Sequence, residues 1–208
     1  MPPGFTLVEL MIVVVILGIL AAIAIPLYMK FVQQSKTGEA QGNLGKIATL
    51  VEEYYAKTTV QSASGAILPG TGQILAARLP NTARTGSATC DGTPAHNAES
   101  VPQVAGFATL VQKAAYQPAV NEWQCATPAV GCAGDTAWFQ MHFELSSPIR
   151  YVYCYAANTP PTGAQTFTVV ASGDLDGDSS WSRFVRQGQT AADGSIQIGA
   201  LAVTNESE

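Results

Sequence analysis

Three aspartates stand at alternate positions in the segment SGDLDGDSSWS, near the C-terminal end of the chain. The spacing of Asp174, Asp176 and Asp178 lets several carboxylates turn toward one hard cation, and Ca²⁺ prefers such oxygen ligands. The segment is not an EF-hand, because Ser179 and Val185 occupy the positions of the required glycine and glutamate. Aspartate and glycine also form ordinary hairpin turns. A Ca²⁺ site and a solvated turn are both open interpretations, and no cofactor is required.

Four cysteines form a second group of reactive side chains: Cys90, Cys125, Cys132 and Cys154. None belongs to a C-x-x-C pair of the kind that binds zinc or performs thiol exchange. Their even number after an apolar segment predicts two disulfides in an oxidising compartment, with free buried thiols as the alternative. Four cysteines can pair in three ways. The preferred connectivity joins Cys125 to Cys132 and Cys90 to Cys154, because the first of these disulfides closes a short local loop.

Catalytic patterns receive little support from the sequence. The chain has two histidines, His96 and His142, and lacks G-x-S-x-G, H-E-x-x-H and a glycine-rich phosphate loop. His142 lies in a strand-like run, where a core or surface histidine is far commoner than a catalytic one. A net charge of −5 also argues against an electrostatic grip on nucleic acid. We expect a protein that is not an enzyme.

The segment GFTLVELMIVVVILGILAAIAIP, residues 4–26, is apolar enough to cross a membrane. Twenty residues without a formal charge separate Glu9 from Lys30, and as a helix they span the roughly 30 Å hydrocarbon core. A carboxylate inside such a helix costs about 2.5–3.5 kcal/mol at mid-bilayer and less near the interface. Glu9 therefore requires a compensating interaction.

The apolar pattern changes after Lys30 into a stripe at three- and four-residue steps, formed by Ala40, Leu44, Ile47, Leu50, Val51, Tyr54 and Tyr55. Glu39, Glu53 and Lys57 lie on the other side of the same helix. A continuous helix from about Thr6 to about Lys57 is predicted, bent at Pro26 by the missing backbone donor and weakened at its glycines, which include Gly18.

Short runs rich in β-branched and aromatic residues fill the C-terminal third and predict an antiparallel sheet of four or five strands, at residues 138–145, 149–157, 166–172, 180–187 and 195–201. Tyr151, Tyr153 and Tyr155 alternate and share one face, which favours packing over an adhesive patch. Residues 60 to about 121 are predicted to be loops with one or two short helical turns. The stripe and the sheet each need the other for burial, so the fold class is α+β.

The segment GFTLVEL, followed by the apolar run and "IP", closely resembles the leader and N-terminal helix of type IV pilins and of the related pseudopilins of type II secretion. The resemblance is very specific over residues 4–57, moderate in the C-terminal third and absent between them. It implies the type IV pilin fold, in which the C-terminal half of one long helix packs on the sheet.

The resemblance also implies roles for particular residues. Prepilin peptidase would cut between Gly4 and Phe5, and Phe5 would become the N-methylated first residue. Gly18 and Pro26 match positions that soften the helix in this family. The carboxylate of Glu9 would then meet the Phe5 amine of a neighbouring subunit in a filament and set the register. Major pseudopilins bind Ca²⁺ in a C-terminal loop, which adds support to the aspartate site.

The resulting prediction divides the chain into a leader at 1–4, a transmembrane and filament-core helix at 5–28, and an exported globular domain at 29–208. Identical subunits, prepilin peptidase and the pilus assembly machinery of the inner membrane are the expected partners. The precursor would lie in the inner membrane of a Gram-negative-type bacterium and the mature chain in a surface pilus serving motility, adhesion or DNA uptake. Minor pilins and pseudopilins are close alternatives.

Two further interpretations of the apolar segment do not involve assembly into a filament. Ala22-Ile23-Ala24 resembles a signal-peptidase site, although the apolar run is too long for a secretory signal and no basic residue precedes it. A plain single-pass anchor holding a ligand-binding domain would also need only the apolar composition. The placement of Gly4, Phe5 and Glu9 favours the pilin interpretation.

Overall fold

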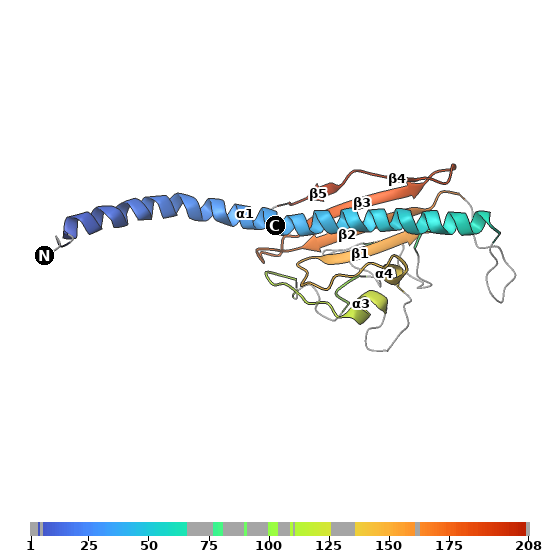
Figure 1. The fold of residues 1–208 in the computed structure, drawn as a ribbon, viewed down its shortest axis with the longest axis horizontal. Helices are drawn as coiled ribbons and strands as arrows, with labels where there is room; N and C mark the ends of the chain where they lie inside the picture. The colour runs from blue at the N-terminus through green and yellow to red at the C-terminus, as the bar shows by residue number, and fades with distance from the viewer. Residues whose placement is uncertain are drawn as a thin grey trace.

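The structure is a computed structural model, and it describes residues 4, 6–65, 77–80, 90, 100–103, 109, 111–125, 136–160 and 163–206. Its longest element is helix α1 (Leu7–Ala63), which has 57 residues and ends at Ala63 rather than near Lys57. The N-terminal half of α1 extends alone from the rest of the molecule, and the C-terminal half lies along the sheet (Figure 1). The long helix predicted from the sequence is therefore confirmed.

Pro26 lies inside α1 and does not end it. Proline has no N–H for the carbonyl four residues earlier, so the Ala22 carbonyl lacks its intrahelical donor. Figure 1 shows a gentle bow over the N-terminal half of the helix without a sharp break. The predicted bend thus takes the form of a smooth curvature.

Five strands form one antiparallel sheet, as expected: β1 (Val152–Asn158), β2 (Thr166–Gly173), β3 (Ser182–Thr190), β4 (Ile196–Ile198) and β5 (Ala202–Thr204). The order is β1-β2-β3-β4, and β5 pairs with the other end of β3 on the same side as β4. The register places Tyr155 opposite Val169, and Val169 opposite Arg186. These three side chains consequently share the face that α1 covers.

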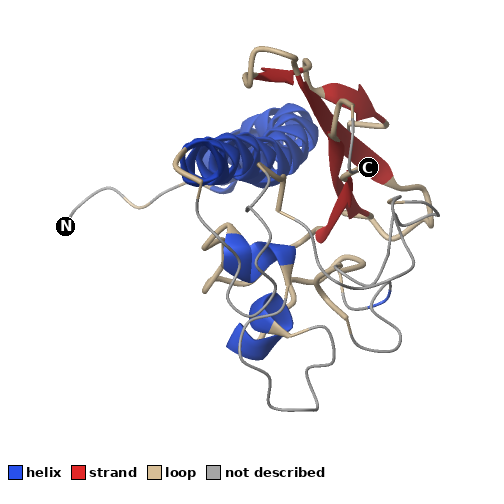
Figure 2. Cartoon of the chain, turned by 90° about the vertical axis from the view of Figure 1, so that its right-hand side faces the viewer, coloured by secondary structure: helices blue, strands red, loops and turns tan. Residues whose placement is uncertain are grey.

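The main core lies between α1 and this face of the sheet (Figures 1 and 2). From the predicted stripe, α1 buries Ala40, Leu44, Ile47, Val51 and Tyr55, whereas Tyr54 is half-buried. Burial of each of the larger aliphatic side chains, Leu44, Ile47 and Val51, contributes about 1.5–3 kcal/mol. Tyr151, Tyr153 and Tyr155 are at most 1% exposed, which confirms that these tyrosines serve packing.

A smaller cluster occupies the opposite face of the sheet. Cys154, Ala156 and Val170 pack there with Cys90, because residues at even positions of β1 and β2 point away from α1. The disulfide between Cys90 and Cys154 joins segments 64 residues apart across this cluster. It therefore fastens part of the middle of the chain to the sheet.

The strand predicted over residues 138–145 is wrong. Thr136 accepts a hydrogen bond from the Phe139 N–H at 3.1 Å and begins the short helix α4 (Ala137–Gln140). Another short helix, α3 (Val120–Gln124), lies beside it. The aromatic residues that suggested a strand instead fill the core from this helical turn, because Trp138 and Phe143 are at most 2% exposed.

Helix α4 ends in a Schellman motif. The His142 N–H donates to the Phe139 carbonyl at 3.1 Å, and the Phe143 N–H donates to the Trp138 carbonyl at 2.9 Å. His142 takes the left-handed conformation that this motif requires, with φ of 54°. The rings of Trp138 and Phe143 close the motif with centroids 5.6 Å apart. Local capping and aromatic burial thus override the β-propensity of the segment.

The middle of the chain is described only in part. The structure describes residues 60–121 only in part: α1 extends into this stretch as far as Ala63 and α3 begins at its end, while the one or two helical turns predicted within it stay a prediction. Most residues between 66 and 110 lie outside the described residues, as does His96. Where the structure does describe this stretch, Val101 pairs with Tyr153 and extends the edge of β1.

Candidate functional site

The N-terminus of α1 carries the acid that the sequence analysis singled out. Thr6 is the N-cap, and its hydroxyl oxygen accepts a hydrogen bond from the Glu9 N–H at 3.3 Å. The same hydroxyl donates to the Glu9 carboxylate at 3.3 Å. Glu9 is therefore also a local helix-capping residue, and a carboxylate at this end is favoured by the helix dipole. The spacing Thr6-x-x-Glu9 is a readable signal that the sequence analysis did not use.

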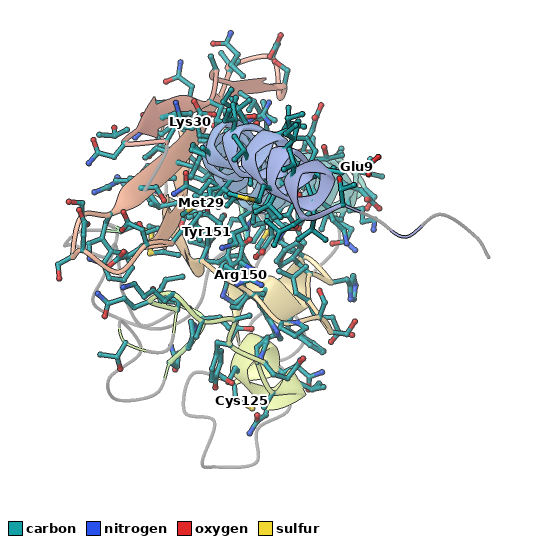
Figure 3. All side chains as sticks on the ribbon, turned by 90° about the vertical axis from the view of Figure 1, so that its left-hand side faces the viewer. Glu9, Met29, Lys30, Cys125, Arg150 and Tyr151 are labelled. Carbon is teal, nitrogen blue, oxygen red and sulfur yellow. A yellow bond between two sulfur atoms is a disulfide. The ribbon has the colours of Figure 1, made fainter. Side chains whose placement is uncertain are left out.

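The Glu9 carboxylate remains accessible in this arrangement. Gly4, Thr6 and Glu9 are all exposed, and Phe5 lies outside the described residues. In the view along α1 from its N-terminal end, Glu9 projects on the side of the helix away from the sheet (Figure 3). The acid is thus available to a partner beyond its own chain.

An apolar surface follows directly after this cap. We call residues Leu7–Phe31 of α1 the exposed segment. Every large hydrophobic side chain in it is 48–74% exposed. Gly18 lies inside it, and an added Cβ there would meet no atom within 4 Å. Apolar patches of this extent are not left bare to water by soluble monomers, so lipid or protein must cover them.

The exposed segment also satisfies the dimensions of a membrane span. Among the described residues, α1 is the one helix long and apolar enough to cross a bilayer, with a mean hydropathy of 3.1 in its most apolar window and none of that window buried. The apolar side chains continue to Phe31, beyond the predicted boundary at residue 28. That domain boundary stays a prediction.

A polar clamp joins α1 to β1 and to Arg150 just before it, at a point beyond the end of the exposed segment. The Glu39 carboxylate accepts hydrogen bonds from the Arg150 N–H at 3.2 Å and from the Tyr153 hydroxyl at 3.1 Å. Asn43, one helical turn later, donates to the Tyr153 oxygen at 2.7 Å. Figure 3 shows Arg150 and its neighbour Tyr151 directly beneath the helix. Glu39, Asn43, Arg150 and Tyr153 form the clamp.

Burial governs the electrostatics of the clamp. It raises the pKa of Glu39 above the ordinary value, and the hydrogen bonds from Arg150 and Tyr153 offset only part of this effect. Burial and the neighbouring Glu39 carboxylate raise the pKa of Tyr153 well above its usual range, so the phenol stays protonated and keeps donating. The clamp therefore adds hydrogen bonds to the apolar packing of α1 on the sheet.

The aspartate segment forms a turn organised around one buried carboxylate. Asp174 is fully buried, and its oxygens accept hydrogen bonds from the Gly177 N–H at 2.5 Å, the Ser179 N–H at 3.1 Å and the Gln112 side-chain amide at 2.7 Å. Burial alone would raise the pKa of Asp174, but these hydrogen bonds outweigh it and hold the pKa below the ordinary value.

The other two aspartates are exposed and bond their own turn. Asp176 accepts from the Asp178 N–H at 3.2 Å, and Asp178 accepts from the Ser180 N–H at 2.6 Å. One oxygen from each of the three aspartates lies within 4.8 Å of the others, a spacing that fits a single hard cation. The hydrogen bonds account for the turn without a cation, and the Ca²⁺ site stays a prediction.

The remaining sequence candidates separate from one another in space. Cys90 and Cys154 are bonded in the preferred pairing, and Cys125 is also disulfide-bonded, while Cys132 lies outside the described residues. His142 is exposed on the turn after α4. Its nearest acidic neighbours include Glu53 of α1, with which it shares a cavity. The features that need a partner gather on α1.

The fold defines a class of α+β protein in which one long helix packs on the sheet with its C-terminal half and projects with an apolar N-terminal half long enough to span a membrane. The pattern described as Prokaryotic N-terminal methylation motif matches residues 3–25. The chain is 34% identical over 128 residues to fimbrial protein EcpC of Eikenella corrodens, covering 61% of this chain and 83% of that protein. The chain therefore belongs to the type IV pilin family.

Other relatives match mainly the N-terminal helix. The type IV major pilin protein PilA of Myxococcus xanthus is 54% identical over 54 residues, which is 26% of this chain and 24% of that protein. Type II secretion system core protein G of Pseudomonas aeruginosa is 49% identical over 51 residues, 24% of this chain and 36% of that protein. No solved structure matches the chain significantly. Membership in a family of structural subunits also supports the expectation of a non-enzyme.

Proposed function

We propose that this chain is the subunit of a type IV pilus. It is made as a precursor in the inner membrane of a Gram-negative-type bacterium, cleaved between Gly4 and Phe5, methylated at the Phe5 amine and polymerised through α1 into a surface filament. The observation that carries the proposal is the exposed segment, Leu7–Phe31, which its own globular domain leaves uncovered. Motility, adhesion or DNA uptake would be the task of the filament.

One apolar surface serves two environments in this proposal. Lipid covers the exposed segment in the precursor, and helices of identical subunits cover it in the filament, where packing replaces lipid contacts. Gly18 and Pro26 ease the change in helix shape that the transfer requires. Prepilin peptidase and the pilus assembly machinery of the inner membrane act before and during this step.

Glu9 sets the register between subunits. Its carboxylate pairs with the α-amine of Phe5 on a neighbouring chain, and in a dry filament core an unpaired charge at either position is strongly unfavourable. Glu9 lies in the first turn of α1, close in sequence to the new N-terminus at Phe5. Subunits that are out of register leave both charges unpaired.

Intact-mass spectrometry of filaments sheared from producing cells tests the proposal. The expected chain begins at N-methylated Phe5 and contains residues 5–208. A Gly4→Leu precursor should remain uncleaved in the membrane fraction and be missing from the filaments. If the chain is found solely in membranes with residues 1–4 intact, a tethered domain replaces the pilus subunit.

A pseudopilin or minor pilin is the second candidate, and the similarity to core protein G over 51 residues favours it specifically. These subunits differ from a major pilin in copy number and in the machine that they join. Quantifying this chain against total protein in the sheared filaments distinguishes the two candidates. A major pilin dominates the fibre, whereas a minor pilin is a trace component.

A further inference from the structure

Two cavities lie side by side on the flank of the globular domain and share one residue, His142. The larger, which we call the seam cavity, has a volume of about 390 Å³ and lies between the α1 stripe Leu50–Gln61 and residues 140–142. The smaller, the aromatic cavity, has a volume of about 210 Å³ and is lined by residues of α3, α4 and the turn after α4. The seam cavity alone falls within the size range of small-molecule pockets, about 300–1,000 Å³.

His142 stands between the cavities because of its backbone. It occupies the left-handed position of the Schellman motif, with φ of 54°, where glycine is usual and a larger side chain is disfavoured. The motif itself gains nothing from an imidazole at this position. Residues held in disfavoured backbone conformations cluster at functional sites, and His142 is such a residue at the rim of a cavity.

The seam cavity combines an apolar floor with polar walls. Leu50, Met141 and the half-buried ring of Tyr54 provide the apolar part. Burial raises the pKa of the Tyr54 phenol, so its hydroxyl remains a neutral hydrogen-bonding group. Glu53 and Lys57 bond each other at 2.8 Å and largely cancel each other's charge. The seam cavity therefore offers a ligand the planar rings of Tyr54 and His142 and a phenol hydroxyl, and the net charge of its lining is small.

The aromatic cavity continues this chemistry on the other side of His142. Phe139 is 43% exposed at its mouth, with its ring centroid 6.3 Å from that of His142. Trp123 lines the cavity, is 1% exposed, and its indole N–H has no hydrogen-bond partner among the described residues. Gln124 and Glu144 complete the polar lining.

We propose that the two cavities together bind a neutral saccharide of two rings, one ring on each side of His142. A pyranose ring has an apolar C–H face that suits aromatic and aliphatic floors, and a rim of hydroxyls that suits amide, carboxylate and indole groups. Anionic ligands are disfavoured, because Glu53 and Lys57 neutralise each other and the remaining charged residue in the two linings is the acidic Glu144. This inference does not depend on filament assembly.

Ligand-observed NMR on the full chain in a polyoxyethylene detergent, which contains no sugar, tests the proposal. The probes are maltose, cellobiose and chitobiose, with choline and inorganic phosphate as charged comparisons. We expect saturable binding of at least one disaccharide, stronger than that of either charged probe. No saturable binding of any of the three disaccharides, or tighter binding of choline or phosphate than of every disaccharide, overturns the proposal.

Three variants locate the binding. His142→Gly removes the imidazole while giving the left-handed position its preferred residue, so the fold is retained, and Tyr54→Leu keeps apolar volume but removes the phenol. Each should weaken disaccharide binding by about tenfold or more. Asn205→Gly, at a remote residue with φ of 52°, is the matched control and should bind as the unchanged chain does. Equal binding by the unchanged chain, His142→Gly and Tyr54→Leu contradicts the assignment.

Discussion

Between Leu7 and Phe31, α1 exposes apolar side chains on every side, whereas between Thr37 and Thr58 it buries one stripe and exposes polar residues on the rest. The two regions form one continuous helix, so backbone geometry does not separate them. The difference lies in what covers the side chains. The distal half is covered by its own sheet, and the exposed segment requires lipid or another chain.

This division explains why one element serves both folding and association. Removing a side chain from the distal half should act on the stability of the globular domain, since that is where its contacts are. The same change in the exposed segment should leave domain stability unchanged and act on insertion or assembly. Substitutions in the two regions, and in the clamp between them, test the division.

The largest expected effect comes from matched leucines in the two halves. Leu44→Ala removes a fully buried side chain and should lower the free energy of unfolding by about 2–5 kcal/mol. Leu17→Ala, at a side chain 59% exposed, should change it by less than about 0.5 kcal/mol. Denaturant unfolding in detergent, followed by tryptophan fluorescence, measures both. Equal losses in the two variants refute the division.

A smaller effect is expected at the clamp. Tyr153→Phe removes the hydroxyl that donates to Glu39 at 3.1 Å, and a hydrogen bond to a charged group contributes about 1.5–3 kcal/mol. Tyr155→Phe is the control, because its hydroxyl donates to the neutral Pro80 carbonyl at 2.9 Å, for which about 0.5–1.5 kcal/mol is expected. The same unfolding experiment compares them. A larger loss for Tyr155→Phe counts against the clamp.

The pH dependence of stability should have opposite signs at the clamp and at the acidic turn. Burial raises the pKa of Glu39, so the folded state favours its protonated form, and this stabilisation is lost as pH rises through the folded-state pKa. Hydrogen bonds lower the pKa of Asp174, so its stabilisation is present above the unfolded-state pKa and is lost as pH falls.

Two isosteric variants isolate these contributions. Glu39→Gln should gain stability relative to the unchanged chain as pH increases, and Asp174→Asn should lose its deficit as pH decreases. Thermal midpoints measured across the acidic range for all three chains provide the differences. Parallel curves for Glu39→Gln and the unchanged chain mean that Glu39 does not titrate differently on folding.

The smallest effect concerns Ca²⁺ at the aspartate turn. If the predicted site exists, added Ca²⁺ should stabilise the domain by about 0.4 kcal/mol when its concentration equals the dissociation constant, and by more above that. Asp176→Asn with Asp178→Asn should abolish the shift while leaving the hydrogen bonds of Asp174 with Gln112, Gly177 and Ser179 intact. Mg²⁺ is the comparison ion. No shift with Ca²⁺ leaves the segment as a hydrogen-bonded turn.

Periodicity predicted much of this fold because burial dictates it. The helix stripe from Ala40 to Tyr55 and the strands with alternating aromatic residues repeat at distinct intervals, and each is apolar on the face that the other covers. The strand β5 was missed because three residues, Ala202–Thr204, are too few to show an alternation. A strand of three residues is defined by its pairing with a neighbouring strand and not by its own sequence pattern.

Other features depend on contacts that sequence order conceals. Glu39 and Tyr153 meet across 114 positions, and nothing local to either marks the pair. The false strand at residues 138–145 arose because histidine stands where a Schellman motif normally has glycine, so the usual helix-end signal is missing. The capping pair of Thr6 and Glu9 could have been predicted from the spacing Thr-x-x-Glu. The charge of Glu9 was instead interpreted only as a sign of a partner on another subunit.

The incorporation of Glu9→Gln and Thr6→Val into sheared filaments, each measured against its level in membranes, tests the assembly claim most directly. Glutamine can still accept the hydrogen bond from the Thr6 hydroxyl but cannot pair as an anion with an amine, whereas Thr6→Val removes the cap and keeps the charge. We expect Glu9→Gln to insert normally into the membrane but to be poorly incorporated into filaments, while Thr6→Val assembles nearly as the unchanged chain does. Normal incorporation of Glu9→Gln, or an equal defect in both variants, would contradict the intersubunit role of Glu9.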